Sequence, residues 1–238
     1  MRKSTLLIGS ALATVMAAGA TTADAASPGW YVSGSVGANW VDDDSFATPF
    51  SFSGFYTTSA TTLAGNIDYD TGWALMGAVG YRFAEPWRVE LEFSSRWNDL
   101  SSHFSGSFYS ASITGDVQTT ALMANVAYDL NIAERLNLTL GGGVGYGWVD
   151  YSANFAASFT TFFSTTTYTT RGSFSDDDSG FAYQLIAGLD FEVSDTTDLF
   201  VEYRYFGVND DSNSLLNGID DYNASTVLVG VRASLGAQ

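Results

Sequence analysis

The chain has 238 residues and a formal net charge of −17, and its aromatic content equals its charged content at 15% each. A polyanion would be repelled by this charge, which excludes nucleic acid as a partner. The sequence contains no cysteine, which excludes disulfides, thiolate metal sites and cysteine nucleophiles. Its 24 glycines, its many aromatic residues and its low lysine content favour strands over helices, so we expect an all-β protein.

The N-terminus has the pattern of an export sequence. Arg2 and Lys3 precede an apolar run from Leu6 to Ala20, and Ala23-Asp24-Ala25 matches a small-residue cleavage pattern. The alternative is an N-terminal membrane anchor, but the run is shorter than the roughly 20 residues that a spanning helix needs. We therefore predict a cleavable signal peptide at 1–25 and a single mature domain at 26–238.

The first clear strand pattern lies between Trp87 and Trp97, where apolar and polar positions alternate. Its odd positions are mostly large and apolar, and its even positions are Arg88, Glu90, Glu92, Ser94 and Arg96. A period of two is typical of a strand with one apolar face. The same pattern predicts strands at 73–83, 181–191 and 227–235, and weaker versions lie at 30–40, 120–130, 136–148 and 199–205. Eight strands are therefore expected.

The charged residues of these strands share one face. An arginine at the lipid-facing centre of a membrane barrel costs about 2–4 kcal/mol, so this face is expected to point into a barrel. The predicted interior ion network comprises Arg82, Arg88, Glu90, Glu92, Arg96, Asp129, Asp190, Glu192, Glu202, Arg204 and Arg232. Its near balance of charge favours a filled interior over a wide channel.

All the tryptophans share the opposite, apolar face and lie near predicted strand ends. They are Trp30, Trp40, Trp73, Trp87, Trp97 and Trp148. Tryptophan in such positions is typical of the two interfaces of a membrane barrel. The alternative is that they are core aromatics of a soluble sandwich.

The predicted connections alternate in length. Long polar segments near 41–68, 98–115, 151–178 and 207–221 alternate with short ones at 84–86, 131–134 and 194–197. Outer-membrane barrels have short periplasmic turns and long external loops, and an open sheet edge is not tolerated in lipid. We therefore predict a transmembrane antiparallel up-and-down β-barrel, with eight strands and both termini in the periplasm.

Three segments resemble a known family: GWALMGAVGYRF at 72–83, RVELEF at 88–93 and LFVEYRY at 199–205. They are similar to the small outer-membrane β-barrels that include alphaproteobacterial porin-like surface antigens and are related to the OmpA transmembrane domain. The resemblance covers Trp30 to Leu235. It implies an outer-membrane location and a structural or surface-interaction role, antigen- or adhesin-like, without catalysis. A small porin-like channel for ions or small solutes is the first alternative.

The single histidine gives a second alternative. His103 lies near Asp99, Ser101, Ser102 and Ser105, which supply the residue types of a hydrolase or acyltransferase. The surrounding sequence is rich in serine and glycine. It offers no evident rigid scaffold that would hold the histidine, as the base, next to a serine nucleophile. We therefore expect a solvated histidine and no enzymatic activity.

The acidic clusters are candidate weak sites for loosely bound calcium or magnesium, and no other cofactor is expected. The candidate ligands are Asp42, Asp43, Asp44, Asp176, Asp177, Asp178, Asp210 and Asp211, with further acids at Asp68, Asp70, Asp220 and Asp221. The alternative is that these acids only solvate exposed strand ends. The predicted partners are outer-membrane lipid and lipopolysaccharide, and the protein is expected to be a monomer.

Two further features bear on partners and on a pore. Aromatic residues in the predicted loops either contact a surface or host ligand or fold over the barrel mouth: Phe46, Phe50, Phe52, Phe55, Tyr56, Phe155, Phe159, Phe162, Phe163 and Tyr168. Four inward glycines leave room for arginines, permit a bend or line a narrow pore: Gly141, Gly143, Gly145 and Gly147.

Overall fold

A computed structural model of the protein describes residues 28–41, 44–53, 58–83, 86–106, 109–160, 167–210 and 222–235. These residues form strands, and two-residue turns are described at 134–135 and 195–196. No helix long and apolar enough to cross a membrane occurs among them. The predicted signal peptide at 1–25 lies outside the described residues.

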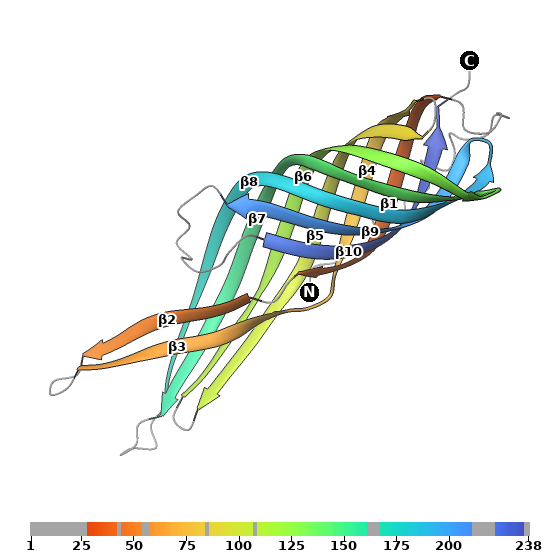
Figure 1. The fold of residues 1–238 in the computed structure, drawn as a ribbon. Coiled ribbons are helices and arrows are strands. Elements are labelled where there is room, and N and C mark those ends of the chain that lie inside the picture. The colour runs from red at the N-terminus through yellow and green to blue at the C-terminus, as the bar shows by residue number, and fades with distance from the viewer. Residues whose placement is uncertain are drawn as a thin grey trace.

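Eight strands close into an antiparallel ring (Figure 1). They are β1 (Gly29–Val41), β4 (Gly72–Arg82), β5 (Trp87–Gly106), β6 (Tyr109–Ala133), β7 (Leu136–Thr160), β8 (Thr167–Ser194), β9 (Thr197–Asp210) and β10 (Tyr222–Ser234). Sequential neighbours pair around the ring, and β1 closes it by pairing with both β4 and β10. The predicted all-β, eight-stranded barrel is confirmed.

The alternating sequence explains which side chains lie inside. On β5, Leu91 and Phe93 are more than half exposed, whereas Glu92 between them is 1% exposed. Val79 of β4 lies directly opposite Leu91 and shares its outward orientation. Because the pleat places successive side chains on opposite faces, the apolar residues form the outer surface and the charged residues fill the interior.

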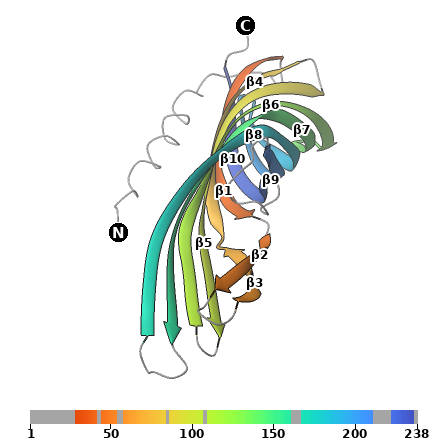
Figure 2. The ribbon, with the colours of Figure 1, turned by 90° about the vertical axis from the view of Figure 1, so that its left-hand side faces the viewer.

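Four strands continue past the barrel as a sheet, which we call the arm. It comprises 98–106 and 109–119 of β5 and β6, and 149–160 and 167–179 of β7 and β8. Figure 2 shows these strands curving away from the barrel. The β5–β6 and β7–β8 registers run through the arm without a shift.

The arm corrects the predicted connections at 98–115 and 151–178, which are largely paired strand. These segments are polar because they lie outside the apolar band of the barrel, and their polarity does not mark the end of strand pairing. Ser, Thr and aromatic residues also suit an exposed sheet, because β-propensity depends on side-chain packing against neighbouring strands.

A hairpin lies within the first predicted loop, 41–68. Its strands are β2 (Asp44–Ser53) and β3 (Thr58–Tyr69). β3 joins the arm through two residue pairs, Asp68 with Ser101 and Tyr69 with Leu100. The first predicted long connection therefore contains a pair of strands. In the last predicted loop, β9 continues to Asp210, and residues 211–221 lie outside the described part of the chain.

Candidate functional site

The end of the barrel interior near the short turns contains an ion-pair network centred on Arg88. The Nη1 of Arg88 lies 2.7 Å from Oδ1 and 2.8 Å from Oδ2 of Asp129. Three more carboxylates lie within 4 Å of its guanidinium, those of Glu90, Asp190 and Glu202. The Arg88 side chain is 1% exposed, so these pairs are shielded from solvent. One arginine thus holds together acids from four strands.

Two more arginines extend this network. Arg232 of β10 lies 2.5 Å from Asp190 and 3.5 Å from Glu202. Arg204 of β9 lies 2.7 Å from Glu202 and also contacts Glu92. Because the residues come from β5, β8, β9 and β10, the network connects distant parts of the ring.

The remaining predicted network residues lie toward the short turns, apart from Arg96. Arg82 pairs with Asp198 at 3.0 Å, and Glu192 accepts a hydrogen bond from Asn137 at 3.1 Å. Asp198 is absent from the predicted network because it falls between the predicted turn at 194–197 and the predicted strand at 199–205. The alternation of the outward residues Leu199 and Val201 would have identified it as inward-facing.

The arm end of the interior combines an apolar cluster with buried uncharged polar side chains such as Asn39 and Asn98. A buried cluster comprises Leu100, Val117, Ala121, Met123, Val149, Ala182, Phe206, Val208, Tyr222 and Ala224. Among the described interior arginines, Arg96 alone has no carboxylate within 4.0 Å. Its guanidinium carbon lies 3.8 Å from the centroid of the Phe206 ring, and its Nη1 donates to Ser94 at 3.0 Å. Along the barrel, the interior therefore changes from a network of ion pairs to side chains that are mostly uncharged.

The inward glycines of β7 mark close contacts. A Cβ added at Gly145 would lie 2.1 Å from the backbone oxygen of Leu122, and one at Gly147 would lie 2.7 Å from Val208. At Gly141 the nearest atom is 2.7 Å away, and at Gly143 it is 1.9 Å away. These glycines permit neighbouring groups to approach the strand, and they leave no opening beside it.

Aromatic side chains form two bands on the outside of the barrel. Near the short turns, Trp30 packs edge-on against Tyr81 and Trp87 packs edge-on against Tyr128. Near the arm, Trp73 stacks on Trp97 with ring centroids 4.0 Å apart. Trp40 and Trp148, both exposed, also lie toward the arm. Exposed aliphatic residues lie between the bands, as in the membrane-facing surface of a barrel.

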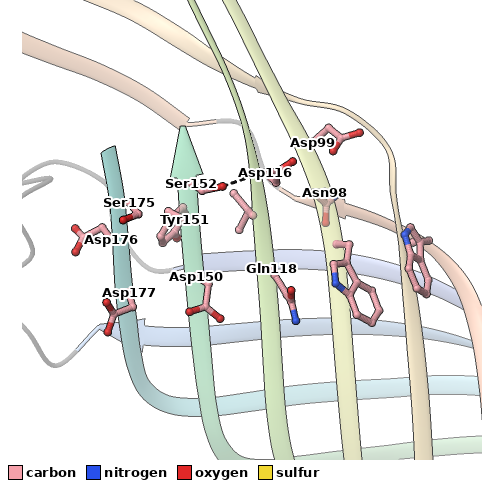
Figure 3. A pocket seen from close by; sticks show the side chains of 13 residues that line it. Asn98, Asp99, Asp116, Gln118, Asp150, Tyr151, Ser152, Ser175, Asp176 and Asp177 are labelled. Carbon is pink, nitrogen blue, oxygen red and sulfur yellow. Dashed lines mark hydrogen bonds between the residues drawn. The ribbon is translucent and has the colours of Figure 1, made fainter. Parts of the chain in front are cut away.

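A pocket of roughly 620 Å³ lies where the arm leaves the barrel (Figure 3). One cross-strand row of its lining runs through Trp73, Trp97, Gln118, Asp150 and Asp177. The next row runs through Asp99, Asp116, Ser152 and Ser175. The pocket thus places a pair of stacked indoles beside carboxylates from four strands.

The acidic rows contain like charges in direct opposition. Asp99 lies opposite Asp116, and Asp150 lies opposite Asp177. Such pairs are destabilising across antiparallel strands unless another charge compensates them. None of these four carboxylates lies within 4.0 Å of an arginine in the described part of the chain. Asp116 instead accepts a hydrogen bond from Ser152 at 2.8 Å. Of these four aspartates, only Asp177 was among the candidate ligands.

The described candidate cation ligands do not converge on one point, as the ligands of a chelating site would. Asp176, Asp177 and Asp178 are successive residues of β8, so their side chains alternate between its two faces. No group of three or more His, Cys, Asp or Glu residues is close enough to hold a metal ion within the described ranges. Asp42, Asp43, Asp211, Asp220 and Asp221 lie outside those ranges, and the side chains of Asp44, Asp68 and Asp210 are not described.

The histidine and loop aromatics are placed only in part. His103 is a residue of β5, opposite Ser112 of β6, and its side chain is not described. Phe155 of β7 is 39% exposed. Phe46, Phe50, Phe52, Phe159 and Tyr168 lie in strands with side chains that are not described, and Phe55, Tyr56, Phe162 and Phe163 lie outside the described residues.

Comparisons with known proteins give one family match and a set of distant structural likenesses. Residues 10–234 match the family model described as outer membrane protein beta-barrel domain. Among solved structures, Neisserial surface protein A is 13% identical, with a TM-score of 0.47 and coverage of 87% of this chain and 97% of that chain. OprG from Pseudomonas aeruginosa is 14% identical, with a TM-score of 0.47 and coverage of 91% and 100%. Ail from Yersinia pestis is 19% identical, with a TM-score of 0.41 and coverage of 87% and 99%. No curated protein sequence matches the chain.

Proposed function

We propose that this chain, which belongs to the outer membrane protein beta-barrel domain family, acts in the outer membrane through its arm. The role is structural or one of surface interaction, antigen- or adhesin-like, without catalysis. One contrast supports this proposal: the barrel interior is filled by ion pairs and an apolar cluster, whereas four strands continue beyond the aromatic band. A surface protein needs such a projecting element, and a channel needs an open interior.

The adhesion experiment uses a non-adherent laboratory bacterium that displays the protein. A trimmed variant replaces 100–115 and 152–175 with tight turns, which shortens the arm and keeps the barrel strands. We expect cells with the full arm to be retained on an epithelial monolayer and on polystyrene, and cells with the trimmed arm to be washed away. Equal retention at equal surface expression would contradict the proposed role.

The channel alternative is tested in planar bilayers. The Arg88 network and the cluster around Phe206 and Tyr222 occupy successive levels of the interior, which supports a closed barrel. We expect the reconstituted protein to give no stepwise conductance, with a known porin as a positive control. Regular conductance steps would favour the channel. Turnover of a lipid or peptide that is lost on His103→Ala would favour the enzyme alternative.

The outward acids also suit the phosphorylated outer leaflet. We propose that loosely held calcium or magnesium ions bridge the rows at Asp99–Asp116 and Asp150–Asp177 to lipopolysaccharide phosphates, because flexible oxygen ligands suit these hard cations. The rows lie beside the Trp73–Trp97 pair, which supports a position at the headgroup level. Calcium should raise the melting temperature in lipopolysaccharide vesicles, and this effect should shrink in an Asp150→Asn, Asp177→Asn double variant. An unchanged melting temperature in the wild-type protein would reject the bridge.

A further inference from the structure

The pocket where the arm leaves the barrel carries negative charge that the chain itself cannot neutralise. Asp99, Asp116, Asp150 and Asp177 are all exposed on its outward face. The structure describes every lysine or arginine beyond residue 3, and these are Arg82, Arg88, Arg96, Arg135, Arg171, Arg204 and Arg232. The segments outside the described residues therefore add no such cation after Lys3.

None of these seven arginines is placed to compensate the pocket. Four of them pair with interior acids, and Arg96 is buried inside the barrel. Arg135 lies at the β6–β7 turn, at the opposite end of the barrel. Arg171 is six residues from Asp177 on β8, about 20 Å along the strand. The compensating charge must therefore come from a bound cation or from dissolved salt.

The pocket offers such a cation an aromatic wall. Trp73 covers one face of the Trp97 indole, with ring centroids 4.0 Å apart and an angle of 16° between the planes. The other face of Trp97 lies on the side of β6, where the exposed Gln118 is its direct neighbour. Asp150 follows Gln118 on β7, and Figure 3 shows these two side chains on adjacent strands. A cation above Gln118 would thus lie between an indole face and a carboxylate.

This combination favours an organic ammonium group over a metal ion. The face of a tryptophan ring attracts a cation within about 6 Å of its centroid. Calcium and magnesium prefer oxygen ligands and water, so the indole contributes little to their binding. An ammonium group on an aliphatic chain can contact the ring and donate charge-assisted hydrogen bonds to carboxylates at the same time.

The spacing of the acids favours a ligand with several ammonium groups. Neighbouring strands lie about 4.8 Å apart, and the two acidic rows, two residues apart along each strand, are separated by about 7 Å. Ammonium groups joined by three or four methylenes lie roughly 5–6 Å apart at standard bond lengths. The pocket volume of roughly 620 Å³ is within the range of about 300–1,000 Å³ that is usual for small ligands.

We propose that this pocket binds a linear aliphatic polyamine, with one ammonium group against the free face of Trp97 and the others between the acidic rows. Asp116 keeps acceptor sites for the ligand beside its hydrogen bond from Ser152. The inference goes beyond the proposed surface role and does not depend on it. The polyamine competes with the calcium or magnesium of the proposed lipopolysaccharide bridge, because both use the same carboxylates.

The first experiment separates recognition in the pocket from simple charge attraction. Spermidine and hexaamminecobalt(III) both carry three positive charges, but only spermidine has aliphatic segments between its charges. Each is titrated by calorimetry into the protein in phosphatidylcholine nanodiscs at 0.15 M salt, roughly the physiological ionic strength, with empty nanodiscs as the blank. We expect spermidine to bind at least ten-fold more tightly. Equal or tighter binding of the cobalt complex would overturn the proposal.

Matched tryptophan variants test the aromatic wall. Trp97→Leu removes the free indole face, and Trp148→Leu makes the same change at an exposed tryptophan of the same band that does not line the pocket. We expect Trp97→Leu to weaken spermidine binding by about five-fold, as the loss of a cation–π contact implies, and to leave the cobalt complex unaffected. Trp148→Leu should change neither affinity. Equal weakening of spermidine by the two variants would reject the site.

Matched acid variants test the rows and keep the indoles in place. Asp150→Asn with Asp177→Asn should weaken spermidine binding at least ten-fold. Glu134→Gln with Asp195→Asn removes the same charge at exposed positions of the opposite turns and should weaken it less than two-fold. Equal weakening by the two pairs would assign the binding to the net charge of the protein and would contradict the proposal. Heat-dependent mobility on SDS gels checks that each variant is folded.

The outcomes distinguish this inference from the lipopolysaccharide bridge. If spermidine fails to bind while calcium raises the melting temperature in lipopolysaccharide vesicles, this inference fails and the bridge stands. If spermidine binds as expected while calcium has no effect, the pocket is a polyamine site and the bridge fails.

Discussion

Replacing Arg88 with methionine should strongly destabilise the barrel. Methionine is of similar length and keeps an apolar stem in place, but it removes the positive charge between Asp129, Glu90, Asp190 and Glu202. Removing one partner of a buried ion pair typically costs about 3–5 kcal/mol, because the remaining charge has no compensation. Arg204 and Arg232 still contact Glu202 and Asp190, so we expect the loss for Arg88→Met to lie near the lower end, about 3 kcal/mol.

The measurement is equilibrium unfolding by urea in lipid vesicles, followed by tryptophan fluorescence. The tryptophans report directly, because they lie on the strands and most are exposed on the outer surface. Arg135→Met is the matched control: Arg135 is exposed at the β6–β7 turn, and the change should alter stability by less than about 0.5 kcal/mol.

A double variant tests whether the cost comes from the uncompensated carboxylate. Adding Asp129→Asn to Arg88→Met removes the acid in closest contact with the arginine. We expect the two changes together to cost less than the sum of the single changes, by about 0.5–3 kcal/mol. Strict additivity, or a loss below about 1 kcal/mol for Arg88→Met alone, would refute the reasoning.

Three other predictions follow from the outer surface, the glycines and the orientation. Leu91→Arg should lower the free energy of unfolding by about 2–4 kcal/mol in the same assay, because the side chain faces outward between the aromatic bands. A decrease of less than about 0.5 kcal/mol would place this face outside the bilayer. Gly145→Ala should lower the free energy of unfolding by about 1–3 kcal/mol, because its Cβ would meet a backbone oxygen. Gly34→Ala is the control and should be nearly neutral, because no atom lies within 4 Å of its Cβ position. Equal decreases for the two variants would contradict the close packing at Gly145. On intact cells, a membrane-impermeant maleimide should label Ser173→Cys in the arm and spare Glu134→Cys at the opposite turn, and the reverse pattern would invert the predicted topology.

The ring and its filled interior could be predicted because alternation is a local property of the sequence. Arg88, Glu90 and Glu92 alternate with Val89, Leu91 and Phe93, and only one assignment of faces avoids charge in lipid. The individual ion pairs could not be predicted, because the partners of Arg88 come from β6, β8 and β9 as well as from its own strand. Those contacts depend on how the strands are staggered around the ring.

The arm could not be predicted for a different reason. Polar composition near Asp99 and Asp150 was interpreted as loop, because in a membrane barrel the end of the apolar pattern usually coincides with the end of the strand. Here the apolar outer face ends near Trp97 and Trp148, while backbone pairing continues to Gly106 and Thr160.

The uninterrupted registers of the β5–β6 and β7–β8 pairs have a mechanical consequence. The β7–β8 ladder runs from Leu136 opposite Phe191 to Thr160 opposite Thr167, so the arm and the barrel wall are one continuous sheet. A pull on the far end of the arm is therefore carried along the strands and loads many backbone hydrogen bonds in shear at the same time. Among the described residues, no register shift interrupts the β5–β6 or β7–β8 ladder, so a force applied to the arm would pass directly into the wall of the barrel.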